Sequence, residues 1–249
     1  MGVLVVTGTG TGIGKTVVTA AVAALALDSG HRVAVLKPAQ TGMAPGEDGD
    51  AAEVARLAGP VTRCELARYP EPLAPDTAAR RSGLPGVGPQ RIAAAAARLA
   101  DSHDLVLVEG AGGLLVRYDG EHTLADAVLR MVDSEVPAEV LVVAPAGLGA
   151  LNSTALTAEA LRHRGLPLLG VVVGAWPVQA DLAARCNLTD LPTVAGVPLL
   201  GALPEGCAAL GADAFLAAAG AGLAPRLGGR WDAAEFTEQQ AAPLPIPVG

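Results

Sequence analysis

The 249-residue sequence predicts an α/β fold, a mostly parallel β-sheet with helices on both faces. Two observations support this prediction. Short apolar runs rich in valine and leucine alternate with stretches of helical composition along most of the chain, a pattern typical of parallel strands joined by right-handed crossovers. The first apolar run also breaks into a glycine-rich loop that passes directly into a helical stretch, as in α/β proteins that bind ligands at strand ends.

Each apolar run predicts a buried strand, because aliphatic and β-branched side chains suit a sheet that is covered on both faces. The expected strands are residues 3–6, 33–36, 104–109, 139–145, 168–173 and 197–203. The stretches between them are rich in alanine and leucine and predict helices. The expected helices are residues 17–27, 50–58, 90–99, 123–131, 154–164 and 213–221. Gly30 and Gly165 mark the ends of two of these helices.

Two segments of the chain are rich in proline. Residues 60–90 contain six prolines and predict a surface excursion with one short helix around 76–81. Residues 225–249 contain further prolines at 243, 245 and 247 and predict a mobile tail. We therefore expect a single α/β domain over residues 1–224, followed by that tail.

The composition excludes several classes of partner. The formal net charge is −8 and only 2% of the residues are aromatic, so neither a basic surface nor an aromatic ladder for nucleic acid is expected. The longest apolar runs are too short to cross a membrane. The three cysteines lie far apart, without the spacing of a disulfide framework or a zinc site. A cytoplasmic protein without nucleic-acid or membrane partners is expected.

Residues 8–16 have the composition of an anion-binding loop. Glycines allow successive N–H groups to point at one anion, and the following helix adds its positive end. Lys15 is expected to reach the β- and γ-phosphates of a nucleotide, and the Thr16 hydroxyl to bind Mg²⁺. The loop is a variant P-loop, because five residues separate Gly8 from the triplet Gly14-Lys15-Thr16. The alternative is a glycine-rich surface turn.

Lysine usage singles out two positions. Lys15 and Lys37 are the two lysines among 17 basic residues, which indicates a need for a compact ammonium beside phosphate or a reacting centre. Lys37 follows the second expected strand and opens the segment Lys37-Pro38-Ala39-Gln40-Thr41-Gly42. Ligands bind at this end of open α/β sheets. The alternative for Lys37 is a surface charge at a strand end.

Two carboxylates are candidate Mg²⁺ ligands. Glu109 ends a buried strand and precedes Gly110-Ala111-Gly112-Gly113. This arrangement places a carboxylate, and a backbone without bulky side chains, beside phosphate. The alternative for Glu109 is an exposed carboxylate. Asp50 begins the expected helix 50–58, where it could also serve only as a helix cap.

The turn Gly149-Ala150-Leu151-Asn152 lies before the expected helix 154–164. Free amides at a helix start bind carboxylates, but the same residues also serve as an ordinary cap. From the residues alone, the cap is favoured.

These motifs together resemble the dethiobiotin synthetases of biotin biosynthesis. The resemblance rests on the stretched P-loop of residues 8–16, the Lys-Pro-x-x-(Thr/Ser)-Gly segment from Lys37, the Val-Glu-Gly-Ala-Gly-Gly strand end around Glu109, and the Leu-Gly-x-(Leu/Ile)-Asn turn ending at Asn152. It extends from about residue 3 to residue 220. Four motifs in register are more specific than any one of them.

The resemblance implies an ATP- and Mg²⁺-dependent ligase. In the family, 7,8-diaminononanoate takes up CO₂ as a carbamate, the γ-phosphoryl group activates the carbamate, and the second amine closes the cyclic urea. By resemblance, Lys37, Lys15 and Thr11 are catalytic, and Thr16, Asp50 and Glu109 contact Mg²⁺. The resemblance also assigns Thr11, Lys37, Thr41, Gly149, Ala150, Leu151 and Asn152 to the diamine substrate.

The nucleotide side implied by the resemblance comprises the P-loop, the two carboxylates and three strand ends. Its residues are Gly12, Ile13, Gly14, Lys15, Thr16, Val17, Asp50, Glu109, Gly110, Ala111, Gly112, Gly174, Ala175, Pro204, Glu205 and Gly206. Many family members have Glu where this chain has Gly12, and an Asn near Gly174, so the base preference is open and ATP is the default co-substrate. The family also implies a homodimer whose residues 149–152 bind the substrate carboxylate across the subunit boundary.

Other classes of protein share parts of this pattern. The main alternative is a P-loop switch ATPase of the septum-positioning or partition type, which places an extra lysine where this chain has Gly10. An amidotransferase-type synthetase would need an ammonia source, and no nucleophilic cysteine domain is visible. A non-catalytic nucleotide-binding module would leave the two lysines unexplained.

Overall fold

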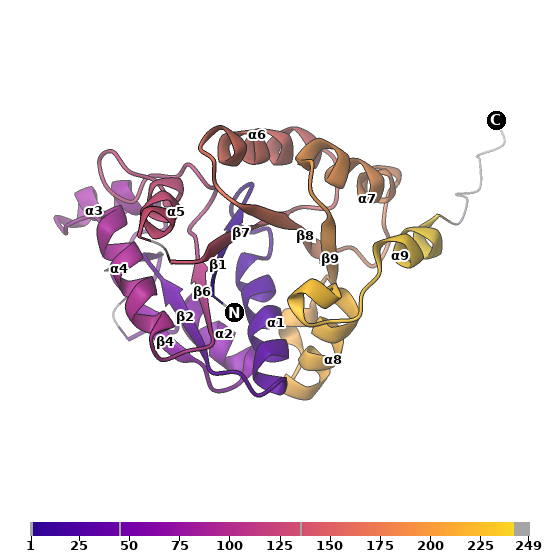
Figure 1. The fold of residues 1–249 in the computed structure, drawn as a ribbon, viewed down its shortest axis with the longest axis horizontal. Helices are drawn as coiled ribbons and strands as arrows, with labels where there is room; N and C mark the ends of the chain where they lie inside the picture. Colours follow the sequence, from indigo (N-terminus) through magenta and orange to yellow (C-terminus); the bar gives the residue numbers. More distant parts are fainter. Residues whose placement is uncertain (1, 45, 135, 242–249) are drawn as a thin grey trace.

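The computed structural model describes residues 2–44, 46–134 and 136–241. Seven strands form one parallel sheet in the order β4-β2-β6-β1-β7-β8-β9 (Figure 1). This confirms the predicted fold class. The strands are β1 (Val3–Gly8), β2 (Val33–Lys37), β4 (Thr62–Glu65), β6 (Leu105–Glu109), β7 (Ala138–Ala144), β8 (Leu168–Trp176) and β9 (Leu199–Pro204).

Helices cover both faces of the sheet (Figure 1). Helices α1, α2 and α8 pack on one face, and α4, α5, α6 and α7 on the other. Their bounds are α1 (Lys15–Asp28), α2 (Asp50–Ala58), α4 (Pro89–Ala100), α5 (Leu124–Asp133), α6 (Ala150–His163), α7 (Leu182–Ala195) and α8 (Ala212–Gly222). No helix in the described ranges is long and apolar enough to cross a membrane.

Alternation along the strands divides the core into two layers. Val3 and Val5 of β1 belong to the layer that contains α4 and α5, whereas Leu4 and Val6 belong to the layer that contains α1 and α2. Successive strand side chains point to opposite faces, so a strand that is covered on both sides is apolar throughout. This explains why the buried strands were visible in the sequence as continuous apolar runs.

Residues 60–90 contribute more to the fold than the expected surface excursion, which is a correction. Within them β4 is the edge strand of the main sheet, and β5 (Arg68–Tyr69) pairs with β3 (Gln40–Thr41) in a small second sheet. The expected short helix is α3 (Pro75–Ser82). The strand β4 escaped prediction because its sequence, Thr-Arg-Cys-Glu, is polar and only partly buried, as an edge strand allows.

Two helices begin where the sequence did not indicate them. Helix α7 was not predicted, because its interior Pro192 cannot donate a helix hydrogen bond. Asp181 caps this helix by accepting a hydrogen bond from Ala184 N at 2.7 Å, and the helix buries its own Leu188 and Leu191 against the core. Helix α6 begins at Ala150 and not at residue 154, so the predicted turn is partly the first turn of the helix.

The C-terminal segment packs on the domain as far as residue 241. The short 3₁₀ turn η2 (Pro225–Leu227) leads to α9 (Ala233–Gln240). Trp231 is buried, and Phe236 of α9 packs edge-on against Trp176, with the ring centroids 5.3 Å apart. The tail predicted from Pro225 therefore includes packed structure, and residues 242–249 lie outside the described ranges.

Candidate active site

The P-loop connects β1 to α1, and Lys15 is the first residue of the helix. Gly12 and Gly14 have φ angles of +73° and +93°, a conformation that glycine adopts without strain. The Lys15 ammonium donates to Gly10 O at 2.7 Å. Burial lowers the pKa of Lys15, and the nearby positive charge of Lys37 lowers it further. The Lys15 ammonium is thus a partly desolvated cation that the P-loop holds at the start of α1.

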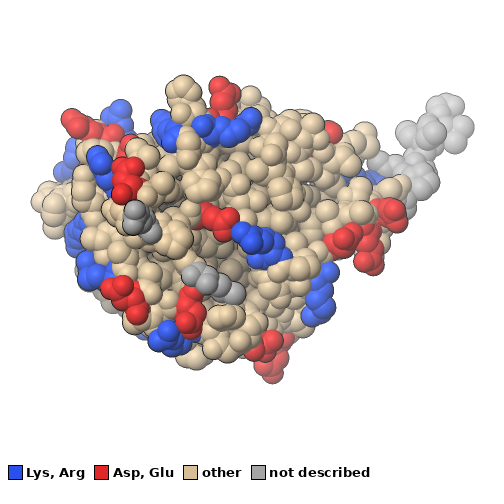
Figure 2. All heavy atoms as spheres, in the orientation of Figure 1, with Lys and Arg blue, Asp and Glu red and all other residues tan. Residues whose placement is uncertain are grey.

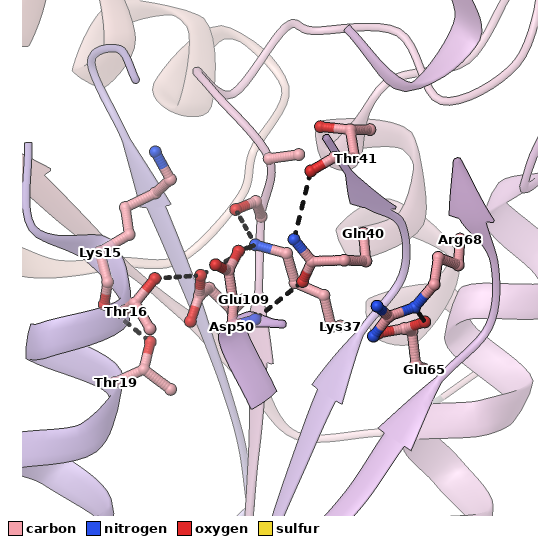
Figure 3. A network of polar contacts seen from close by, with 12 residues as sticks. Lys15, Thr16, Thr19, Lys37, Gln40, Thr41, Asp50, Glu65, Arg68 and Glu109 are labelled. Carbon is pink, nitrogen blue, oxygen red and sulfur yellow. Dashed lines mark hydrogen bonds and ion pairs between the residues drawn. The ribbon is translucent and has the colours of Figure 1, made fainter. Parts of the chain in front are cut away.

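Lys37 lies at the centre of a buried charge cluster (Figure 3). Its Nζ is 2.8 Å from Glu109 Oε1 and 2.5 Å from Asp50 Oδ2, and it donates to Gly110 O at 3.3 Å. Lys37 is 3% exposed and Glu109 1% exposed, so both surface alternatives are wrong. Burial lowers the pKa of Lys37, but Glu109 and Asp50 together outweigh this effect and raise it above its ordinary value.

The cluster joins the P-loop through Thr16. The Thr16 hydroxyl donates to Glu109 Oε1 at 2.9 Å. The other carboxylate oxygen, Oε2, is buried and has no hydrogen-bond partner among the described residues. A buried anionic oxygen without a partner costs free energy unless a cation or a donor compensates it. Two carboxylates and a hydroxyl are also the oxygen ligands that Mg²⁺ prefers. The chemistry of these residues therefore fits a hard divalent cation.

Asp50 is positioned by the start of α2. It is the first residue of the helix, and the cap position belongs to Gly49. Its backbone N–H donates to Gln40 Oε1 at 2.8 Å, and Gln40 Nε2 donates to Thr41 O at 3.3 Å. The Asp50 side chain therefore pairs with Lys37 and does not cap the helix.

A pocket of about 720 Å³ lies over this cluster. It brings together most of the expected site: Thr11, Gly12, Gly14, Lys15, Thr16, Val17, Lys37, Thr41, Asp50, Glu109, Gly110, Ala111 and Gly112. Gln40, which was not expected, also lines it. The other lining residues are apolar: Ala39, Met43, Pro72, Leu73, Ala74, Pro75 and Val116. The lining thus includes residues suited to phosphate and apolar residues suited to an alkyl chain.

The end of β8 lies against the P-loop. A Cβ placed on Gly174 would lie 2.0 Å from Ile13 O, so the two backbones are in direct contact. Glu205 N donates to Trp176 O at 2.8 Å and ties the ends of the two strands together. Ala175, Pro204, Glu205 and Gly206 are exposed on this rim.

The turn at residues 149–152 lies apart from the pocket. Gly149, with a φ of +89°, is the cap residue of α6, and Asn152 is exposed within the first turn. None of the four residues lines the pocket that contains Lys37. The Asn152 side chain does not cap the helix, because Gly149 holds the cap position and, among the described residues, no side-chain cap hydrogen bond is made in α6. The structure of one chain does not bring this turn and Lys37 together.

Comparison with known proteins identifies the family. A sequence profile described as an AAA domain matches residues 3–207. The ATP-dependent dethiobiotin synthetase BioD of Streptomyces avermitilis is 65% identical over 237 residues, which cover 95% of this chain and 98% of the relative. The chain belongs to the dethiobiotin synthetase family. The BioD of Saccharopolyspora erythraea is 68% identical over 231 residues, 93% of this chain and 99% of the relative. Membership of the dethiobiotin synthetase family confirms the resemblance and the expected class of enzyme, a ligase.

The fold of this dethiobiotin synthetase family member is also found in P-loop ATPases. The cell-division ATPase MinD of Pyrococcus furiosus superimposes with a TM-score of 0.52 at 20% identity, over 88% of this chain and 97% of that one. A ParA family ATPase of Chlorobium tepidum gives 0.54 at 13% identity, over 87% and 90% of the two chains. At these identities the likeness shows the fold alone. It explains why a switch ATPase was a reasonable alternative.

Two buried residues of the site were not among the predicted site residues. Gln40 holds the start of α2, as described above. Tyr118 is 1% exposed, and its hydroxyl oxygen accepts a hydrogen bond from Ala111 N at 2.6 Å. For Gln40 the sequence offered a signal, since it lies inside the Lys37 segment. For Tyr118 the scarcity of tyrosine in the chain was the available signal.

Proposed function

We propose that this protein catalyses the ATP- and Mg²⁺-dependent carboxylation and ring closure of 7,8-diaminononanoate with CO₂, which yields dethiobiotin, ADP and phosphate. This is the penultimate step of biotin synthesis. The observation that supports it most directly is the ammonium of Lys37, which is buried between Glu109 and Asp50 and lines the same pocket as the P-loop. The lining of the pocket includes both the P-loop and apolar residues suited to an alkyl chain.

The chemistry requires positive charge where anions meet. An amine of the substrate and CO₂ form a carbamate, and a carbamate oxygen attacks the γ-phosphorus as ADP leaves. The second amine then attacks the carbonyl carbon of the carbamic-phosphoric anhydride and expels phosphate, which closes the ring. In the proposal Lys37 and Lys15 stabilise the charge that develops on the transferred phosphoryl group, and fixed donors do this without reorganisation. Thr11 and Thr41 hold the amine end of the substrate.

A divalent cation fits the remaining residues. Within the part of the chain that the structure describes, the buried Glu109 Oε2 lacks a hydrogen-bond partner, and Thr16 and Asp50 supply further oxygens. In the proposal these three residues hold Mg²⁺, which supplies positive charge beside the phosphates. ATP is the proposed co-substrate. Its base would lie against the rim formed by Gly174, Ala175 and residues 204–206, where the exposed side chains offer no amide.

A homodimer in the cytoplasm completes the proposal. Residues 149–152 lie outside the pocket of their own chain, and helix N-termini bind carboxylates. We propose that they bind the carboxylate of a substrate held by the partner subunit. The exposed Leu148 and Leu156 on either side of this turn, 94% and 58% accessible, support a contact between subunits there.

Phosphate release tests the proposed reaction. Purified protein with Mg²⁺, bicarbonate, ATP and 7,8-diaminononanoate should release phosphate and form dethiobiotin, detected by mass spectrometry. Omission of the diamine should abolish the release. Hydrolysis at an equal rate without the diamine would contradict the assignment and favour a switch ATPase. Parallel reactions with CTP and GTP would establish the base preference.

A further inference from the structure

The loop between β6 and α5 contains a buried tyrosine that contacts the wall of the pocket. The Tyr118 hydroxyl oxygen accepts from Ala111 N at 2.6 Å, and its side chain is among the largest fully buried ones. Ala111 lies between Gly110 and Gly112, and all three line the pocket. We call residues 109–112 the strip.

The strip is held from two sides. On the pocket side, Lys37 Nζ contacts Glu109 Oε1 at 2.8 Å and donates to Gly110 O at 3.3 Å. On the core side, the Ala111 N–H is directed to Tyr118 and is not available to a ligand. A Cβ on Gly110 would lie 2.7 Å from Leu124 Cδ2, so the strip also packs closely against the base of α5.

Tyr118 itself is fixed in place. Its backbone N–H donates to His122 O at 2.9 Å, and its carbonyl accepts from Val87 N at 3.0 Å. A Cβ on Gly86 would lie 2.8 Å from Tyr118 O, so the segment before α4 closes over this residue. Burial also raises the pKa of the Tyr118 phenol, and the hydroxyl stays neutral at physiological pH. A rigid, neutral acceptor of this kind preorganises the group that it contacts.

We propose that Tyr118 is a positioning residue for the strip. Its hydroxyl fixes the Ala111 N–H toward the core, and this sets the path of the backbone from Glu109 to Gly112 beside the phosphate and cation sites. The inference rests on the proposed function in one respect, that a Mg²⁺-nucleotide binds at this pocket. It does not depend on the identity of the second substrate.

The chain offers a matched control, because its other tyrosine has the same burial and a similar hydrogen bond. Tyr69 is also 1% exposed, and its hydroxyl donates to Pro85 O at 2.7 Å, a carbonyl outside the pocket lining. Tyr118→Phe and Tyr69→Phe each remove one buried hydroxyl without changing the shape of the ring. Both variants should lose a similar amount of thermal stability.

The two variants should differ in binding. The affinity for the Mg²⁺ complex of a non-hydrolysable ATP analogue, measured by calorimetry, should fall about 10-fold in Tyr118→Phe and change less than about twofold in Tyr69→Phe. The Mg²⁺ concentration for half-maximal binding should rise in Tyr118→Phe alone. If Tyr118→Phe does not fold, hydrogen exchange in the wild-type protein gives a second test. The Ala111 amide should be equally protected with and without the Mg²⁺-nucleotide, and protection that appears only with the nucleotide would overturn the inference.

Equal affinities and equal Mg²⁺ dependence in the two variants would overturn the inference, as would a wild-type protein that does not bind the analogue. Failure of the proposed reaction has a different outcome. In that case the wild-type protein would show no diamine-dependent phosphate release, while the binding difference between the tyrosine variants would remain.

Discussion

Lys37 and Glu109 illustrate how single residues couple stability to function in this protein. Both side chains are almost completely buried, and their charged atoms are 2.8 Å apart. Removal of one member of a buried pair leaves the other charge uncompensated, which costs more than the pair itself contributes. Substitution of Lys37 should therefore affect folding as well as the proposed chemistry.

Lys37→Met is expected to lower the free energy of unfolding by about 3–5 kcal/mol, because Glu109 loses its cation in a desolvated site. It should also lower turnover by a factor of about 10³ or more, because positive charge at the reacting centre is lost. The double variant Lys37→Met/Glu109→Gln should regain most of the stability but no turnover. Denaturant unfolding and phosphate release measure the two effects. Unchanged turnover in Lys37→Met would remove Lys37 from the proposed mechanism.

At the scale of elements, the site depends on contact between the P-loop and the end of β8. The ladder between β8 and β9 is irregular between Val173 and Trp176, and in this region Gly174 meets the backbone of Ile13. Two polypeptide backbones can lie this close only where a side chain is absent. Trp176, two residues further on, packs on Phe236 of α9. The position of the P-loop is therefore linked to the C-terminal helix through β8.

Gly174→Ala should disturb this contact. The new Cβ would lie 2.0 Å from Ile13 O, and relief of such overpacking costs about 1–3 kcal/mol. We expect a lower melting temperature and weaker nucleotide affinity, since the P-loop must shift. Gly120→Ala is the control, because no atom of the described residues lies within 4 Å of a Cβ there, and its effect on the free energy of unfolding should stay within about 0.5 kcal/mol. Equal melting temperatures and affinities for the two variants would show that the P-loop does not depend on this contact.

At the scale of the whole molecule, the surface suits the proposed dimer and not a polyanionic partner. Acidic and basic side chains are interspersed on the face shown in Figure 2, and the net charge is −8. A second hollow, of about 470 Å³, runs from Gly10 and Thr11 to Leu156 and Thr157 on α6. The hollow shares Thr11 with the main pocket. An adjoining subunit on this side would lie next to the site.

Leu156→Glu tests this arrangement. A charge on the exposed apolar face of α6 should convert the proposed dimer to a monomer, because a buried carboxylate without a partner is costly at an interface. The monomer should still bind the Mg²⁺-nucleotide but lose diamine-dependent phosphate release. Leu84→Glu, at an exposed leucine after α3, should change neither property. Light scattering measures the molar mass of each protein in solution. A wild-type protein with the mass of a monomer would contradict the proposed dimer.

The sequence by itself determined the parallel sheet, the P-loop and the family. Strands covered on both faces must be apolar throughout, and a loop that turns around an anion must contain glycine, so both features are local and appear as runs and spacings. The helix α2 was predicted with the bounds that the structure shows, Asp50–Ala58. Lys37 and Glu109 were identified as candidates because polar residues at the ends of apolar strands lie at one edge of a parallel sheet.

Only the tertiary structure decided which of these residues meet. The contacts of Lys37 with Asp50 and Glu109, and of Tyr118 with Ala111, join elements that are separate in the sequence. The edge strand β4, the helix α7 with its interior Pro192 and the packing of Trp231 also depend on neighbours that no local pattern encodes. Residues 149–152 lie outside the pocket of their own chain. Long-range packing fixes these relations, because the free energy of each contact depends on partners distant along the chain.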